Sequence, residues 1–333
     1  MLVGLASSAL LTYLIMWFGL RKGVLDVPNA RSSHTFPVPR GGGLAIIITF
    51  YVFLYIASGF SALPLGDLSL ASLMFGGAII AAVGASDDLH NMPAQWRFFA
   101  HLIAALIALI LLPVFPAIEV FGRSFPLDNI GIPVYAICLV WSANLFNFMD
   151  GIDGLAGSEA ITVLGCAALI LFANGQSDWM LLLGFLSACV AGFLAWNWPP
   201  ARIFMGDAGS GFLGFAFGIL AIESSVSGAI TLWTWAILLG VFIVDATTTL
   251  IVRMTSGAKW YEAHRSHAYQ ILARRFESHR KVTVGVIVIN LVWLFPLGYL
   301  ASAYPYWGLV CCAIAWAPLV VLALKVGAGR SES

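Results

Sequence analysis

The sequence predicts an all-α polytopic membrane protein, and three observations support this fold class. Of the 333 residues, 61% are hydrophobic and only 10% are charged, and the mean hydropathy is +0.94. The apolar residues form repeated runs of about 20, the length of helix that crosses the hydrocarbon core of a bilayer. Asp87, Asp88, Asp150, Asp153 and Asp207 lie at the edges of these runs. Carboxylates collected at one membrane face indicate a metal and phosphate site, and therefore an enzyme.

Each apolar run predicts one membrane span, and together the runs give about eleven spans, with about ten as the lower count. No soluble domain, low-complexity linker or internal repeat interrupts them, so we expect a single integral membrane domain over residues 1–333. The first run lacks the features of a signal peptide and is expected to stay as a span. The predicted spans lie near residues 2–20, 41–59, 69–86, 98–114, 130–148, 156–173, 179–197, 209–223, 230–252, 283–302 and 306–325.

The basic residues predict the orientation of these spans. Of the 16 Lys and Arg residues, only Arg123 falls in one of the two sets of loops. Because positively charged loops stay in the cytoplasm, the N-terminus is expected outside and the C-terminus in the cytoplasm. The active site is expected at the cytoplasmic face, since the polar motifs lie in the cytoplasmic stretches 21–40, 86–97 and 253–282. On the outer side, Ile118 to Leu127 favours a small hairpin.

The overall charge and the cysteines exclude several functional classes. The formal net charge is zero, and no nucleic-acid partner is implied. The five cysteines all fall within predicted spans, where a thiol usually behaves as a small apolar group, and their spacing forms no disulfide framework or zinc motif.

The first cytoplasmic loop contains Arg31, Ser32, His34 and Arg40, followed by three glycines. Prolines and consecutive glycines do not belong in a helix interior, so an ordered turn is expected through which backbone can approach a ligand closely. The polar groups suit a phosphate or a lipid head group. Alternatively, this is a surface loop whose basic residues attract anionic lipid.

The next loop begins with the adjacent acids Asp87 and Asp88. Two neighbouring carboxylates at a low-dielectric boundary repel each other unless a cation or hydrogen-bond donors compensate them, and Mg²⁺ would do so. The alternative is a solvated helix end.

Four polar residues, Asn144, Asn147, Asp150 and Asp153, recur every three residues at the end of one span. In a straight helix the first and last would face opposite ways, so a common cluster requires a helix break, which Gly151 and Gly154 can provide.

The sequence Phe204-Met-Gly-Asp-Ala-Gly-Ser-Gly211 leads into a later span. Asp207 and Ser210 can cap that helix, and a glycine-flanked helix N-terminus also suits phosphate and Mg²⁺. Asp245 differs because it lies within a span, where it should be hydrogen-bonded, protonated or near the site.

The last cytoplasmic loop contains His264, Arg265 and His267. If this segment is helical, the two histidines share a face and can ligate a metal. We favour diphosphate binding, because hard Mg²⁺ prefers oxygen ligands and two histidines alone make a poor Zn²⁺ site.

Taken together, these motifs resemble the polyprenyl-phosphate N-acetylhexosamine-1-phosphate transferase superfamily, glycosyltransferase family 4. The resemblance covers nearly the whole chain, in order: the Pro-Asn-Ala-Arg-Ser-Ser-His loop with its Arg-Gly-Gly-Gly turn, Asp87-Asp88, Asn-x-x-Asn-x-x-Asp-Gly-x-Asp-Gly, Phe-x-Gly-Asp-x-Gly-Ser and a His-containing loop near the C-terminus. The family initiates O-antigen, enterobacterial common antigen and teichoic acid linkage units, and includes the phospho-MurNAc-pentapeptide translocase.

The resemblance implies transfer of a sugar 1-phosphate from a UDP-N-acetylhexosamine to undecaprenyl phosphate, with release of UMP, in the bacterial inner membrane. It also implies Mg²⁺ as the cofactor, with Mn²⁺ as a substitute. The candidate catalytic residues are Asp87, Asp88, Asp150 and Asp153, and the candidate metal ligands are Asp207 and Asp150. The candidate substrate-binding residues are Asn144, Asn147, His264, Arg265, His267, Arg31, Ser32, His34 and Arg40.

Two departures from the family pattern bear on the sugar. Leu89, His90 and Asn91 follow the acidic pair where a third Asp or a Lys is common, and the terminal loop reads His-Arg-Ser-His. Both departures resemble the branch that starts O-antigen chains with N-acetylfucosamine, N-acetylquinovosamine or N-acetylglucosamine. The sequence leaves the sugar and a homodimer open. The alternative function is a polytopic transporter or lipid flippase, for which ionisable groups near mid-membrane on several spans are expected.

Overall fold

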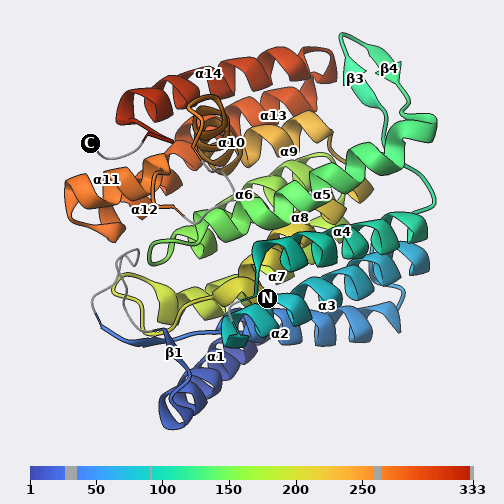
Figure 1. The fold of residues 1–333 in the computed structure, drawn as a ribbon. Helices are drawn as coiled ribbons and strands as arrows, with labels where there is room; N and C mark the ends of the chain where they lie inside the picture. The colour runs from blue at the N-terminus through green and yellow to red at the C-terminus, as the bar shows by residue number, and fades with distance from the viewer. Residues whose placement is uncertain (27–35, 91, 259–263, 331–333) are drawn as a thin grey trace.

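The structure, a computed structural model, describes residues 1–26, 36–90, 92–258 and 264–330. Helices lie side by side, from α1 and α2 at one side of the bundle to α13 and α14 at the other, as Figure 1 shows. The strands of the described part form two antiparallel ladders of two strands each. The elements are α1 (Leu2–Lys22), β1 (Leu25–Asp26), β2 (Val38–Pro39), α2 (Gly43–Ser58), α3 (Asp67–His90), α4 (Ala94–Leu111), β3 (Ile118–Val120), β4 (Arg123–Phe125), η1 (Asp128–Ile130), α5 (Gly131–Met149), α6 (Leu155–Ala173), α7 (Ser177–Asn197), α8 (Gly206–Val226), α9 (Leu232–Leu238), α10 (Gly240–Thr255), α11 (Ala268–Phe276), α12 (His279–Ile289), η2 (Asn290–Leu294), α13 (Phe295–Ala303), η3 (Pro305–Trp307) and α14 (Gly308–Val326).

The prediction of a polytopic helical membrane protein is confirmed, although the count of spans differs. Each predicted span has a helical counterpart, but within the described ranges only nine helices are long and apolar enough to cross a membrane. A tenth span results if the bent pair α9 and α10 is counted as one. The remaining counterpart, α2, has 16 residues, which corresponds to about 24 Å of helix. The orientation stays a prediction from the basic residues.

The span predicted for 230–252 is not one straight helix, because α9 and α10 meet at an angle of 77°. A hydrogen bond from another helix reaches the backbone at this break. The indole Nε1 of Trp316 in α14 donates a hydrogen bond of 3.0 Å to the carbonyl oxygen of Ala236. That carbonyl would be the partner of the Gly240 amide in a continuous helix. Asp245 therefore lies on α10, whose axis differs in direction from that of α9.

The small ladders lie at opposite ends of the bundle. The hairpin of β3 and β4 confirms the prediction for Ile118 to Leu127, and in Figure 1 it lies at one end, while β1 and α11 lie at the other. The pairing of β1 with β2 closes the base of the first loop, with Asp26 opposite Val38. The stretches that carry the polar motifs thus share one end.

The centre of the bundle is α8, which packs against α2, α3 and α5. In its most apolar stretch, 78% of the residues are buried. Glycines allow this close approach. A Cβ atom on Gly84 of α3 would overlap the backbone of Ala208, and one on Gly43 of α2 would overlap the backbone of Gly209. Small residues at helix contacts are the usual means of close packing inside a membrane. The first turn of α8 is therefore held tightly between α2 and α3.

We expect Gly84→Ala to destabilise the protein, because backbone rather than a flexible side chain opposes the added methyl group. Overpacking of a core usually costs about 1–3 kcal/mol. Gly165→Ala is the matched control, since a Cβ on Gly165 of α6 would meet nothing within 4 Å. Thermal unfolding in detergent should show a midpoint several degrees lower for Gly84→Ala than for Gly165→Ala. Equal midpoints would contradict the proposed tight contact of α3 with α8.

Candidate active site

The last turn of α3 meets the first turn of α8, which brings Asp88 to the helix N-terminus beside Asp207. One oxygen of the Asp88 carboxylate, Oδ1, accepts the amide N–H of Asp207 at 3.0 Å. The other, Oδ2, accepts that of Ala208 at 3.4 Å. The first amides of a helix have no partner within it and carry the positive end of its dipole, so a carboxylate there is stabilised. Gly206 has φ +80°, and a Cβ there would press against the Asp88 carboxylate. Asp88 thus caps α8 from another helix.

The capping role considered for Asp207 and Ser210 is wrong for Ser210. Its hydroxyl donates to the carbonyl oxygen of Gly206 at 3.1 Å, inside the helix. Because Asp88 satisfies the first amides of α8, the Asp207 side chain points to another partner.

That partner is Arg97, in the first turn of α4. Its Nη1 atom lies 2.6 Å from Oδ2 of Asp87 and 3.0 Å from Oδ2 of Asp207. Asp87 also accepts the backbone N–H of Met92. One guanidinium therefore bridges two carboxylates that are 120 positions apart in sequence. Arg97 was not predicted as a site residue, because no local spacing distinguishes it from the other basic residues of the cytoplasmic loops.

Arg40 supplies a second positive charge to this group of acids. The chain after β2 pairs with the segment before α8, where Phe204 N–H donates to the carbonyl oxygen of Pro39 at 2.9 Å. Arg40 then lies with Nη2 2.7 Å from Asp26 Oδ2 and Nη1 3.7 Å from Asp88 Oδ1. Burial alone would lower the pKa of Arg40, but these carboxylates raise it above its usual value. Asp26 was not predicted as a site residue, and the pairing of β1 with β2 places it here.

The helix break predicted around Gly151 and Gly154 is confirmed. Helix α5 ends at Met149 and α6 begins at Leu155, and Gly154 has φ +73°. Burial, followed by the negative charge of Asp207, raises the pKa of Asp150 well above its usual range. Asp150 therefore belongs electrostatically to the group formed by Asp87, Asp88 and Asp207.

The two asparagines of the same motif have different partners. Nδ2 of Asn147 donates to the hydroxyl of Ser210 in α8 at 3.3 Å, which ties α5 to the first turns of α8. Nδ2 of Asn144 donates to the carbonyl oxygen of Val140 in its own helix at 2.7 Å. Asn147 therefore points toward the acidic group, whereas this contact of Asn144 stays within α5.

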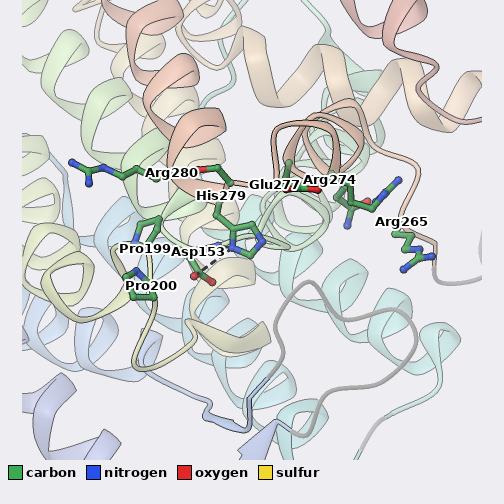
Figure 2. A pocket seen from close by; sticks show the side chains of 11 residues that line it. Asp153, Pro199, Pro200, Arg265, Arg274, Glu277, His279 and Arg280 are labelled. Carbon is green, nitrogen blue, oxygen red and sulfur yellow. Dashed lines mark hydrogen bonds and ion pairs between the residues drawn. The ribbon is translucent and has the colours of Figure 1, made fainter.

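Asp153 turns toward α12 and lines a cavity of about 600 Å³. Its Oδ2 atom accepts the amide of Ala201 at 3.0 Å and lies 3.3 Å from Nδ1 of His279. In Figure 2, Asp153 and His279 face each other, with Arg265 and Arg274 to one side and Arg280 to the other. A cavity of this size with basic lining suits a phosphorylated ligand.

The His264 to His267 segment is not helical, yet it brings the two imidazoles together. Their ring centroids are 4.9 Å apart and the rings are stacked. His267 is 4% exposed and precedes α11, whereas His264 is partly exposed. Burial, together with His267 and Arg253, lowers the pKa of His264 to about 4. His264 is then neutral at pH 7 and offers hydrogen bonds, which leaves Arg265 as a permanent charge of this loop.

The structure gathers most of the predicted site residues into two adjacent places at one end of the bundle. The first, which we call the acidic site, consists of Asp87, Asp88, Asp150 and Asp207 with Arg40 and Arg97. The second is the basic cavity with Asp153 and Arg265. Predicted residues that lie outside the described ranges are Arg31, Ser32 and His34.

The donors at the acidic site are oxygen atoms of carboxylates, which a hard divalent cation prefers. Across the described ranges, no three His, Cys, Asp or Glu side chains converge as a ready-made metal centre. Mg²⁺ usually binds to one or two carboxylates together with substrate phosphates and water. Asp150 and Asp207 lie close enough for the charge of Asp207 to raise the pKa of Asp150, and such a pair of carboxylates fits that mode of binding.

The chain is similar to known proteins over most of its length. The profile of glycosyl transferase family 4 matches residues 70–225, the stretch from α3 to α8. A Bacillus subtilis protein named as a probable undecaprenyl-phosphate N-acetylglucosaminyl 1-phosphate transferase is 29% identical, over 91% of this chain and 84% of that protein. A Mycolicibacterium smegmatis decaprenyl-phosphate N-acetylglucosaminephosphotransferase is 27% identical, over 98% of this chain and 87% of the relative.

A further relative is the Escherichia coli undecaprenyl-phosphate alpha-N-acetylglucosaminyl 1-phosphate transferase, which is 26% identical over 90% of this chain and 83% of its own length. The matched profile contains the acidic pair, the helix break and Asp207, the elements that meet at the acidic site. The central stretch of the chain thus matches glycosyl transferase family 4, and nearly the whole chain is similar to polyprenyl-phosphate N-acetylglucosamine-1-phosphate transferases.

Proposed function

We propose that this protein transfers an N-acetylhexosamine 1-phosphate from a UDP-sugar to undecaprenyl phosphate and releases UMP. The observation that carries the proposal is the acidic site, where Arg97 bridges Asp87 and Asp207 while Asp88 caps α8. Transfer of a phosphoryl group requires positioning and compensation of charge more than covalent chemistry by the protein. Two arginines and four carboxylates at one end of a membrane bundle meet that requirement.

The roles of the side chains follow from their charges. Arg97 and Arg40 offer guanidinium groups, which bind phosphate oxygens through paired hydrogen bonds. Asp87 orients the acceptor phosphate, or takes its proton, so that an oxygen of that phosphate attacks the β-phosphorus of the donor in line. The bond from the β-phosphorus to the bridging oxygen breaks and UMP leaves. The product is a lipid-linked sugar diphosphate.

The proposed cofactor is Mg²⁺, with Mn²⁺ as a substitute, held by Asp207 and Asp150. When bound, the cation neutralises the negative charge of the donor diphosphate. Asp88 keeps α8 in place beside it, because its carboxylate accepts two amides of the first turn. The basic cavity of Asp153 and Arg265, together with His264 and His267, binds the nucleotide-sugar diphosphate.

An alternative course of reaction forms a covalent intermediate. Asp87 or Asp88 would attack the β-phosphorus first, release UMP and then pass the phospho-sugar to the lipid. We favour direct transfer. Trapping of a labelled sugar phosphate on the protein, in the absence of undecaprenyl phosphate, would overturn it.

The relatives' names favour N-acetylglucosamine as the sugar, and the two departures from the family pattern also leave open a 6-deoxy-N-acetylhexosamine such as N-acetylfucosamine or N-acetylquinovosamine. We propose an inner-membrane location and a role in the first membrane step of O-antigen, lipopolysaccharide or a related envelope glycan. A homodimer is a further proposal that size-exclusion chromatography with light scattering can test.

Purified protein in nanodiscs, supplied with undecaprenyl phosphate and radiolabelled UDP-N-acetylglucosamine, tests this function. The UDP-linked 6-deoxy sugars run in parallel, and the Escherichia coli relative serves as a positive control. We expect a lipid-extractable product from at least one donor, abolished by EDTA and restored by Mg²⁺. Lack of lipid product from every donor, with folded protein and an active control, would contradict the proposal.

A further inference from the structure

Asp245 is a buried acid on the broken span, six positions into α10. It is 6% exposed. An ionised carboxylate within a membrane bundle is costly unless donors compensate it. The expectation that Asp245 is hydrogen-bonded is confirmed, and its partners show what it does.

The carboxylate of Asp245 accepts the first amides of α11. Oδ1 accepts the N–H of Ala268 at 2.9 Å, and Oδ2 accepts that of Tyr269 at 2.9 Å. The hydroxyl of Thr249 donates to Oδ1 at 3.2 Å. Both oxygens are thus satisfied, and the positive end of the α11 dipole faces the charge. In return, amides of α11 that have no partner within the helix find one.

The hydrogen bonds from Asp245 tie the start of α11, and with it the His264 to His267 segment, to α10. The side chain of Tyr269 ties the same region to the end of α5. Nδ1 of His267 lies 3.4 Å from Oδ1 of Asp245. The Tyr269 hydroxyl donates to the carbonyl oxygen of Phe148 at 2.8 Å, just before Asp150. A Cβ on Gly151 would overlap that hydroxyl. The start of α11 is therefore fixed between α10 and the break that carries Asp150.

We propose that Asp245 is a positioning residue that docks the His264 to His267 segment against the acidic site. It touches no substrate and acts through α11. The proposal rests on the proposed function for its kinetic consequence, but the docking itself does not. An alternative is that Asp245 contributes only to the stability of the bundle, in which case its loss would leave the loop in place in every folded molecule.

Labelling of an introduced cysteine tests the docking without any assay of activity. Ser266 is 8% exposed, so in a Ser266→Cys protein a polar maleimide should react slowly. The parent chain gives the blank. Adding Asp245→Asn should raise the labelling rate at least about tenfold. The Asn side chain has one acceptor oxygen, whereas the two backbone N–H groups at the start of α11 need two.

Glu159→Gln is the matched control for this experiment. Glu159 is another buried acid in a span, 0% exposed, and Nδ2 of Asn290 donates to it at 2.6 Å. Its change to Gln should leave labelling at Ser266→Cys unaltered. If Asp245→Asn fails to fold, Tyr269→Phe serves instead. It removes the hydrogen bond from Tyr269 to Phe148 and should also raise the labelling rate. Unchanged labelling in a folded Asp245→Asn protein would overturn the proposal.

The kinetic consequence is a rise in KM for the UDP-sugar. We expect Asp245→Asn to raise KM about tenfold or more with a smaller change in kcat, since the loop binds the donor. In the double variant Asp245→Asn with His267→Ala, the rise in KM should not exceed the larger of the two single-variant rises by more than about twofold. Effects that multiply would show that Asp245 does not act through this loop. Inactivity of the wild type would count against the proposed function and leave the labelling result standing.

Discussion

Asp207→Asn is expected to lower the transfer rate at least about 100-fold while the protein stays folded, a loss typical of removing a preorganised charge from an active site. Asp207 lies at the start of α8 and contacts Arg97 at 3.0 Å. It is also a proposed ligand of Mg²⁺. The cap of α8 comes from Asp88 and uses the Asp207 backbone, so the change to Asn keeps the helix start intact. Transfer rates at saturating Mg²⁺ in nanodiscs measure the effect.

Asp178→Asn is the matched control, since Asp178 is an exposed acid in the first turn of another membrane helix, α7. It should keep the parent rate. Size-exclusion profile and thermal midpoint should match the parent for both variants. If Asp207→Asn turned over at the parent rate, the assignment of Asp207 to the acidic site chemistry would be wrong.

The second large effect is expected for Arg97→Gln. This change leaves the carboxylates of Asp87 and Asp207 facing each other without the guanidinium that separates their charges. Truncating one partner of a fully buried, hydrogen-bonded charge pair costs about 2–5 kcal/mol. Because the Arg97 side chain is 31% exposed, we take the lower end, which corresponds to roughly 30-fold in a rate. We expect transfer to fall by at least that factor, measured as kcat/KM for the UDP-sugar.

Arg97→Lys is the graded comparison for this variant. A lysine keeps the positive charge but replaces the planar guanidinium with a smaller ammonium group on a differently shaped side chain, so it should recover part of the activity. Arg202→Gln, an exposed arginine whose guanidinium lies 5.9 Å from the centroid of the Trp196 ring, should leave transfer unchanged. Full activity of Arg97→Gln would show that the bridge seen here plays no part in the reaction.

Much of the fold follows from hydropathy alone, because a run of about 20 apolar residues has few other stable states. The sequence also places the motifs at one end of the bundle. The break between α9 and α10 was not predicted, and the contact found there, from Trp316 of α14 to Ala236, has no local sequence signal. That contact joins residues 80 positions apart, which no window of local sequence covers.

The acidic site was predicted in its carboxylates but not in its arrangement. Four acids at the edges of apolar runs indicate a site, because such positions are costly without a function. No local pattern of residues indicates that Asp88 caps α8 or that Arg97 bridges Asp87 and Asp207. Both contacts depend on close packing of α3 with α8, which Gly84 permits.

The measurement that tests the central claim most directly is the identity of the nucleotide released. Purified protein is incubated with undecaprenyl phosphate, Mg²⁺ and a UDP-sugar that supports turnover, and nucleotides are separated by chromatography. Transfer of a sugar 1-phosphate predicts UMP, formed in equal amount to the lipid-linked sugar diphosphate. Release of UDP instead would mean that the sugar alone is transferred, and would contradict a site built to displace UMP from the β-phosphorus.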